Sequence, residues 1–130
     1  MGAVNPDEIG TRQQMILQCI WDAGGETTVP DIINRLEARY QTHLTGQAVN
    51  TFMILLEQKG LVRKEGKVGR SYLYRTLISE KEFRKRELVR VRELTFGNSS
   101  SALVAAMLET DISDEEMEKI RRMIERYDHA

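Results

Sequence analysis

Residues 41–75, QTHLTGQAVNTFMILLEQKGLVRKEGKVGRSYLYR, decide the fold that we expect for this chain. Four large apolar side chains in this stretch recur at the spacing of one buried helix face: Val49, Phe52, Met53 and Leu56. Thr45 can begin such a helix because its hydroxyl can accept a backbone N–H, and Gly60 can end it. The stretch therefore predicts an amphipathic helix that ends at a glycine.

A basic hairpin is expected directly after this helix. Leu61 to Lys64 and Ser71 to Arg75 have the composition of short strands, and Gly66 and Gly69 are expected in the turn between them. Four cations lie in this region: Arg63, Lys64, Lys67 and Arg70. A helix with a polar N-terminal face, followed at once by a basic hairpin, is typical of a winged helix-turn-helix. We therefore expect the chain to bind duplex DNA.

The candidate base-reading residues lie on the outward side of the predicted helix. Gln47 and Asn50 can bond adenine through both amide atoms, Thr51 offers a hydroxyl and a methyl group, and Ala48 can touch a thymine methyl group. Thr45 and the helix N-terminus can face a phosphate. The hairpin cations would contact phosphates, which set affinity but carry no sequence information. The alternatives are an ordinary solvated helix face and a hairpin edge protected by lysines.

Length and composition set limits on function. The chain has 130 residues and a net charge of −1, yet residues 41–78 hold six cations against two carboxylates. No apolar run reaches the ~18 residues that a membrane span needs, and the first ten residues lack the charged start and apolar core that are typical of a signal peptide. The single Cys19 is expected in the core, and it excludes an intrachain disulfide. A cytoplasmic protein without membrane contact is the expectation.

The rest of the chain predicts helices. Met15, Ile16, Cys19 and Ile20 repeat at helical spacing, and a second helix begins near Val29-Pro30. Beyond residue 78 the pattern indicates three helices, two of them opened by capping boxes at Ser79 and Ser113. The expected fold is mainly α with a small β-hairpin wing. Residues 1–77 are predicted to be the winged-helix DNA-binding domain, and residues 78–130 a helical dimerisation domain.

Homodimerisation is predicted from the second half. Residues 103–108, LVAAML, are apolar on nearly all sides of a helix, and such a helix needs cover from more than one partner. The same segment of a second chain would provide it with two-fold symmetry; in the alternative, these helices fold back onto residues 1–77 in a monomer. The expected interface consists of Leu103, Val104, Met107, Leu108, Met117, Ile120, Ile124 and Tyr127.

Enzyme chemistry has no support in the sequence. His43 and His129 are isolated, and no cluster of Cys, His and Asp has the spacing of metal ligands. No nucleophile–base pattern and no phosphate loop is visible. We therefore expect no catalytic residue, no metal and no cofactor.

An ordered set of motifs resembles the penicillinase-repressor family of bacterial winged-helix regulators, which includes BlaI, MecI and CopY. The similar segments are residues 15–21 (MILQCIW), 28–36 (TVPDIINRL), 45–61 (TGQAVNTFMILLEQKGL), 69–74 (GRSYLY), and 96–99 (FGNS) followed by Leu103-Val104 and Ile112-Ser113. The resemblance covers roughly residues 9–127.

This resemblance implies a cytoplasmic homodimer that binds a dyad-symmetric operator and represses transcription. It assigns base reading to Gln47, Ala48, Asn50 and Thr51, and backbone contacts to the wing. The family usually has threonine in place of Ala48, so one polar contact is missing and a different operator is expected. An inducing protease or sensor is a partner in the penicillinase branch, but the Asn-Phe bond cleaved there is absent. The cysteine cluster of the copper branch is absent too. The inducing signal stays open.

A different class of function remains as an alternative. A winged-helix domain can also serve as a protein–protein interaction module, with the basic wing against an acidic protein and no specific DNA binding. The near-neutral pI of about 6.2 favours this alternative slightly. The dependence of DNA affinity on salt separates the two.

Overall fold

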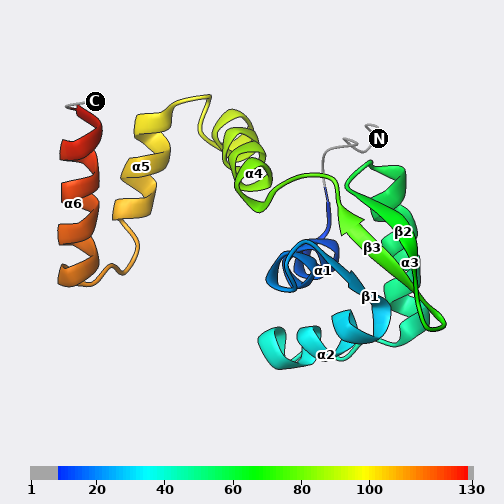
Figure 1. Cartoon of the computed structure of the whole chain (residues 1–130). Helices are drawn as coiled ribbons and strands as arrows, with labels where there is room; N and C mark the ends of the chain where they lie inside the picture. Colours follow the sequence, from blue (N-terminus) through cyan, green and yellow to red (C-terminus); the bar gives the residue numbers. More distant parts are fainter. Residues whose placement is uncertain (1–8, 129–130) are drawn as a thin grey trace. The chain divides into compact units, whose positions relative to one another are not determined.

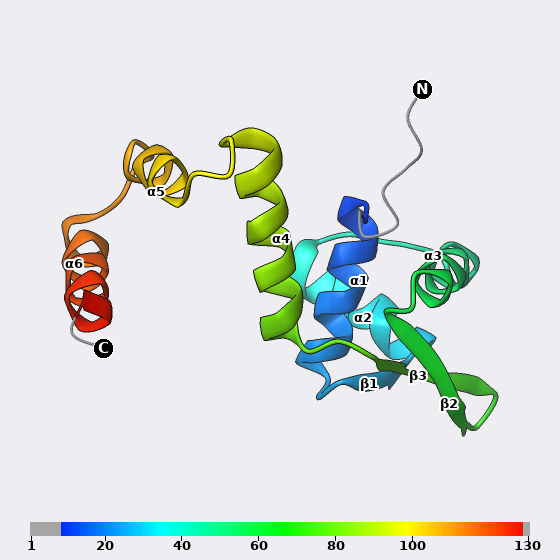
Figure 2. The same cartoon turned by 90° about the horizontal axis from the view of Figure 1, so that it is seen from above.

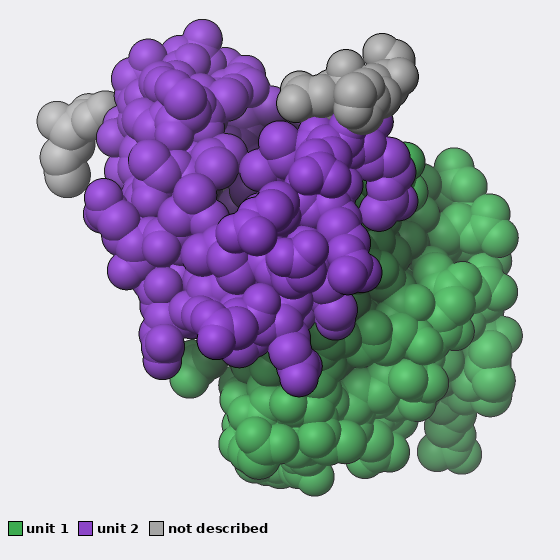
Figure 3. Space-filling model, turned by 90° about the vertical axis from the view of Figure 1, so that its left-hand side faces the viewer, with its two compact units in different colours: residues 1–84 green, residues 85–130 purple. Residues whose placement is uncertain are grey.

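The computed structural model describes residues 9–128. It divides the chain into two compact units, Met1–Arg84 (unit 1) and Lys85–Ala130 (unit 2), which Figure 3 shows in different colours. Each unit has its own organisation. The division falls seven residues after the predicted boundary at residue 77. The assignment of DNA binding to the first part and of dimerisation to the second stays a prediction.

Three helices form the body of unit 1: α1 (Thr11–Asp22), α2 (Val29–Tyr40) and α3 (Gly46–Gln58). Each contacts the other two, and Figures 1 and 2 show them beside a small sheet. Their facing sides contribute fully buried apolar side chains: Ile16, Leu17, Cys19, Ile20, Ile32, Leu36, Val49, Met53 and Leu56. The predicted inward face of α3 is thereby confirmed, with Phe52 half-buried beside it.

The sheet has three antiparallel strands in the order β1-β3-β2. These strands are β1 (Glu26–Thr28), β2 (Val62–Val68) and β3 (Ser71–Thr76). The hairpin of β2 and β3 was predicted, whereas β1 was not, because three residues between Gly25 and a helix carry too short a pattern. β1 pairs along β3, with Thr27 opposite Tyr74. Three packed helices followed by this hairpin make a winged helix-turn-helix.

The turn of the hairpin is tighter than expected. β2 runs to Val68 and β3 begins at Ser71, so only Gly69 and Arg70 form the turn. Gly69 has φ +62°, as the first central residue of a two-residue hairpin turn of type II′ requires. The expectation that Gly66 lies in the turn is wrong. Gly66 lies inside β2 with φ +139°, at an irregularity of the strand pairing.

Side-chain hydroxyls cap three helices at the residues that the sequence predicted, whereas α1 begins after Gly10 without a side-chain cap. Thr45 Oγ1 accepts the backbone N–H of Ala48 at 3.1 Å and so opens α3. The hydroxyls of Ser79 and Ser113 do the same for α4 (Glu80–Thr95) and α6 (Asp114–Asp128). Ser99 caps the short α5 (Ser100–Leu108) in the same way. Such caps stabilise a helix by about 1 kcal/mol each.

The first turn of α4 belongs to the core of unit 1. Phe83 is 4% exposed, and the centroid of its ring lies 5.4 Å from that of Trp21. Trp21 Nε1 also donates a hydrogen bond of 3.1 Å to the backbone oxygen of Ile78. These contacts explain why the compact unit extends past residue 77.

Unit 2 has no fully packed core of its own. None of the described residues beyond Phe83 with an assigned burial is buried. Several large apolar side chains are exposed instead: Leu88, Val89, Leu94, Val104, Met107, Leu108, Met123, Ile124 and Tyr127. A protein in water rarely leaves so many large apolar side chains exposed within so short a segment unless a partner covers them.

Cys19 is a core residue, as the sequence predicted. Its side chain is fully buried, and burial raises the pKa of the thiol to about 11. The thiol is therefore protonated and inert near neutral pH, because only the thiolate reacts readily.

The ion pair between Asp22 and Arg39 joins the ends of α1 and α2. The hydrogen bond from Arg39 lowers the pKa of the Asp22 carboxyl below its ordinary value. A lowered pKa means that the pair stabilises the fold above the pKa of the unfolded carboxyl and that this stabilisation disappears as the pH falls. We expect Asp22→Asn to lower Tm by about 2–4 °C at pH 7.

The difference in Tm between this variant and the wild type should shrink as the pH falls below the ordinary pKa of an aspartate, because the wild-type carboxyl then takes up a proton. Thermal unfolding followed by circular dichroism at pH 7, 5 and 3 measures the difference. Asp111→Asn, at an exposed carboxyl between α5 and α6, is the control. A Tm difference for Asp22→Asn that persists unchanged at pH 3 would contradict the assignment.

Candidate nucleic-acid interface

The outward side of α3 presents polar side chains near its N-terminus. Gln47, Asn50 and Thr51 are all exposed, as predicted. Thr51 Oγ1 donates to the backbone oxygen of Gln47 at 3.0 Å, so this hydroxyl has acceptor capacity left for a ligand. Ala48 lies differently from the other three, because its half-buried side chain packs against the core. Only a fraction of its methyl group is accessible from outside.

A bulge in β2 determines which side of the wing each cation occupies. Side chains alternate along a strand, so two residues three positions apart normally point to opposite faces. Lys64 pairs with Tyr74, however, and Lys67 pairs with Tyr72, with a register shift between Lys64 and Gly66. Directly opposite residues share a face, and so do residues two apart. The extra residue of the bulge therefore places both lysines on the face of the two tyrosines.

The other face of the wing carries a different set of charges. Arg63 lies opposite Arg75, and Arg75 forms an ion pair with Glu26 at 3.5 Å. The Nε atom of Arg63 donates to Glu65 Oε1 at 2.8 Å. The one carboxylate of β2 is thus engaged by Arg63, not by the lysines. The four cations that the sequence suggested as one group are divided between two faces.

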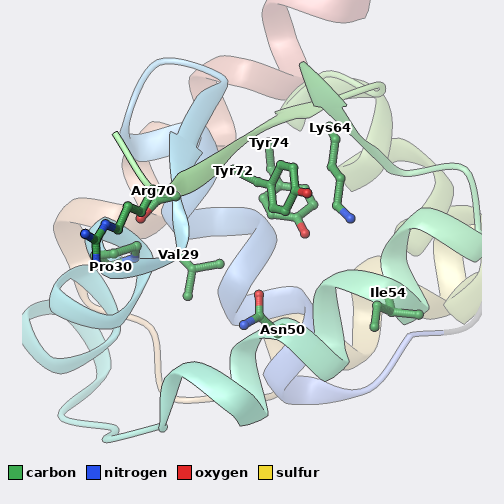
Figure 4. A pocket seen from close by; sticks show the side chains of 9 residues that line it. Val29, Pro30, Asn50, Ile54, Lys64, Arg70, Tyr72 and Tyr74 are labelled. Carbon is green, nitrogen blue, oxygen red and sulfur yellow. The ribbon is translucent and has the colours of Figure 1, made fainter. Parts of the chain in front are cut away.

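A hollow of about 480 Å³ separates α3 from the wing. Figure 4 shows Asn50 and Ile54 on the α3 side, and Lys64, Tyr72 and Tyr74 on the hairpin. Arg70, at the turn, and Val29 and Pro30, at the start of α2, complete its border together with Ser71. Asn50, Lys64 and Arg70 are candidate DNA-binding residues, and the structure brings them to one place.

The walls of the hollow are apolar and its charges are positive. Ile54 is 51% exposed although it is a large apolar residue. Tyr74 is 3% exposed, and burial raises the pKa of its phenol, which stays neutral at any physiological pH. Among the nine residues that line the hollow none carries a carboxylate. The surface is therefore suited to an anionic ligand that also presents apolar groups.

Within residues 9–128 no group of three or more His, Cys, Asp and Glu side chains is placed to hold a metal ion. His43 has its Nδ1 atom 2.6 Å from Glu37 Oε1, and His129 lies outside the described residues. No helix in the described part of the chain is both long and apolar enough to cross a membrane.

Sequence comparison identifies the family. The profile described as penicillinase repressor matches residues 9–126, which span both units. The chain belongs to the penicillinase repressor family. A member of this family is a DNA-binding transcriptional repressor, and the winged helix found here is the fold that the resemblance implied.

Other comparisons of this penicillinase repressor family member add information on the fold. No curated protein matches it in sequence. One solved structure, described as the complex structure of hsRosR-SG (vng0258/RosR-SG), is similar with a TM-score of 0.55. The similarity covers 96% of each chain at 15% sequence identity, so it concerns the fold alone.

Sequence reasoning missed two features of the site. One is the division of the wing cations, for which Gly66 inside the basic run was the available signal, because a glycine in a strand often marks a bulge. The other is the contact of both lysines with Tyr72. The ammonium groups of Lys64 and Lys67 lie 4.4 Å and 4.8 Å from the centroid of that ring.

Proposed function

We propose that this repressor binds a dyad-symmetric operator as a homodimer, with α3 in the major groove and the α3-facing side of the wing on the DNA backbone. One observation carries the proposal. The exposed polar side of α3 and the cationic face of the wing border the same carboxylate-free hollow within one compact unit. Bases and phosphates of one duplex lie within reach of such a surface.

The roles follow from side-chain chemistry. Asn50 and Gln47 each offer an amide that can bond the N6 and N7 atoms of adenine together. Thr51 presents a methyl group and the acceptor side of its hydroxyl. Thr45 and the first N–H groups of α3 are positioned for a phosphate, which the helix dipole favours. Ala48 contributes at most a small apolar contact, because it packs partly against the core.

Dimerisation is assigned to unit 2. Met117, Ile120, Ile124 and Tyr127 share one side of α6, since each residue advances about 100° around the helix. Ile124 is 50% exposed and Tyr127 81%. α5 adds a second set of exposed apolar groups, among them Val104 and Met107. A second copy of the chain would cover both sets and would place two α3 helices on two half-sites.

The decisive experiment is a binding titration with the full-length protein. The probe is the intergenic DNA upstream of its own gene, beside a shuffled duplex of equal length, at two salt concentrations. We expect tighter binding to the genomic probe than to the shuffled one, with an affinity that falls steeply with salt. Equal and weak binding to both probes would reject sequence-specific repression by this chain and favour a protein partner for the wing.

The two faces of the wing predict unequal effects of removing an arginine. Arg70 borders the hollow, whereas Arg63 is held by Glu65 on the other face. We expect Arg70→Gln to weaken binding to every DNA sequence by about 3- to 5-fold and to reduce the salt slope by about 1. Arg63→Gln is the matched control and should change affinity by less than about 2-fold.

Fluorescence anisotropy with the specific and the shuffled duplex, over a salt series, measures both quantities. A larger effect for Arg63→Gln than for Arg70→Gln would mean that DNA approaches the opposite face of the wing.

A further inference from the structure

The ring of Tyr72 contacts the ammonium groups of both wing lysines, Lys64 and Lys67. The Nζ atoms of Lys64 and Lys67 lie 4.4 Å and 4.8 Å from its centroid, within the range of an attractive cation–π contact. Tyr72 is 44% exposed, so the lysines cover it without removing it from solvent. One aromatic ring therefore contacts two cations that lie on the same face of the wing as the ring.

The bulge in β2 is the backbone feature that makes this double contact possible. In a regular strand Lys64 and Lys67 would point to opposite sides, and only one of them could reach the ring. The register shift between Lys64 and Gly66 restores both to the side of Tyr72. Gly66 adopts φ +139°, a conformation that a residue with a Cβ atom rarely takes. The irregularity of β2 at Gly66 thus lies between the two lysines and places both ammonium groups on one face of the wing.

The group that contacts each cation of the wing determines how much positive charge that cation can still offer to a ligand. Arg63 is paired with the carboxylate of Glu65, which offsets its charge at close range and occupies two of its five N–H donors. A neutral ring attracts an ammonium group but leaves its net charge in place and its N–H donors free for an anion. In the wing, Arg63 is therefore paired with a carboxylate, whereas Lys64 and Lys67 contact an uncharged aromatic ring.

Ordering also favours binding. A free lysine side chain loses rotamer entropy when it contacts a phosphate, and this loss opposes association. A lysine that already rests on a ring has fewer rotamers to lose. Both lysines can then contact the backbone with a smaller entropic cost.

We propose that Tyr72 is a positioning residue for DNA binding. Its ring holds the ammonium groups of Lys64 and Lys67 together on the α3-facing side of the wing, where they contact one stretch of the phosphate backbone. This inference rests on the proposed function and adds to it a residue that touches the cations and not the bases.

The test compares Tyr72→Phe and Tyr72→Leu in the full-length protein. Phenylalanine keeps the ring and removes the hydroxyl, whereas leucine keeps apolar bulk and removes the π system. At about 150 mM salt, we expect Tyr72→Phe to bind both the genomic and the shuffled duplex within about 2-fold of wild type. We expect Tyr72→Leu to bind both about 5- to 10-fold more weakly.

The effect of Tyr72→Leu in a variant without the two lysines distinguishes positioning of the ammonium groups from a general effect on folding. In the background Lys64→Met/Lys67→Met the change Tyr72→Leu should weaken binding by less than about 2-fold, because no ammonium group is left to position. Tyr40→Leu is the control, since the Tyr40 ring also contacts a cation, Arg39 at 5.3 Å, but belongs to α2. Its DNA affinity should equal that of wild type.

A measurement without DNA tests the contact itself. In the free protein, ring currents should shift the ε-methylene proton resonances of Lys64 and Lys67 upfield, and Tyr72→Leu should abolish the shift. Wild-type affinity in Tyr72→Leu, or an equal loss with and without the lysines, would overturn the inference while leaving the proposed function intact. Absence of DNA binding by the wild-type protein would remove the proposed function, and the inference with it, even if the upfield shifts are present.

Discussion

Ile124→Glu is expected to break the proposed homodimer into monomers and to weaken binding to the proposed operator by about 100-fold or more. Ile124 lies on the apolar side of α6 and is half-exposed in the single chain, so a second copy would bury it. A carboxylate buried there without a partner costs several kcal/mol. Loss of the dimer also loses the joint binding of two half-sites, which raises affinity by about 10²- to 10⁴-fold.

Sedimentation equilibrium gives the mass, and a titration with the intact operator gives the affinity. Arg122→Glu is the matched control, because it adds the same side chain on the opposite side of α6. It should remain dimeric and bind as wild type does. If Ile124→Glu stayed dimeric with wild-type affinity, the apolar side of α6 would have to serve another purpose.

Asn50→Ala is expected to remove base preference at one position of each half-site. Asn50 is exposed near the N-terminus of α3 and borders the hollow beside the wing. A bidentate contact between an amide and adenine discriminates by about 1–3 kcal/mol, which is on the order of 5- to 150-fold in affinity. The variant should lose this discrimination and keep its salt slope, because no phosphate contact is removed.

Competition with a set of operators, each changed at one base pair, measures the effect. Gln58→Ala is the control, since it removes an exposed amide at the other end of the same helix. It should leave the preference unchanged at every position. An Asn50→Ala profile identical to that of wild type would exclude Asn50 as a base-reading residue.

Many of the helices were predictable because their signals are local. The inward face of α3 repeats at 3.6 residues, and the hydroxyls of Thr45, Ser79 and Ser113 cap helices within three residues of themselves. Such patterns need no knowledge of distant contacts. The exposed positions of Gln47 and Asn50 followed from the same periodicity.

The features that escaped prediction depend on distant pairing. β1 is a strand only because Thr27 meets Tyr74, far along the chain. The faces of the wing cations depend on a register shift in which Glu65 is the extra residue. The alternation of residue types does not reveal this shift, although Gly66 marks its place. The inclusion of Phe83 in unit 1 depends on Trp21. In each case a partner more than five residues away decides the outcome.

The place of β3 in the middle of its sheet has a consequence for how the protein is made. β1 leaves the ribosome early, yet the strand beside which it lies is synthesised more than forty residues later. During that interval the edge of β1 has no partner, and the helices can form only a partial core. The contact between Trp21 and Phe83 can form only later still, after Phe83 has left the ribosome. The complete core of unit 1 can therefore form only after the first turn of α4 has been synthesised, which places the last step of its folding late in synthesis.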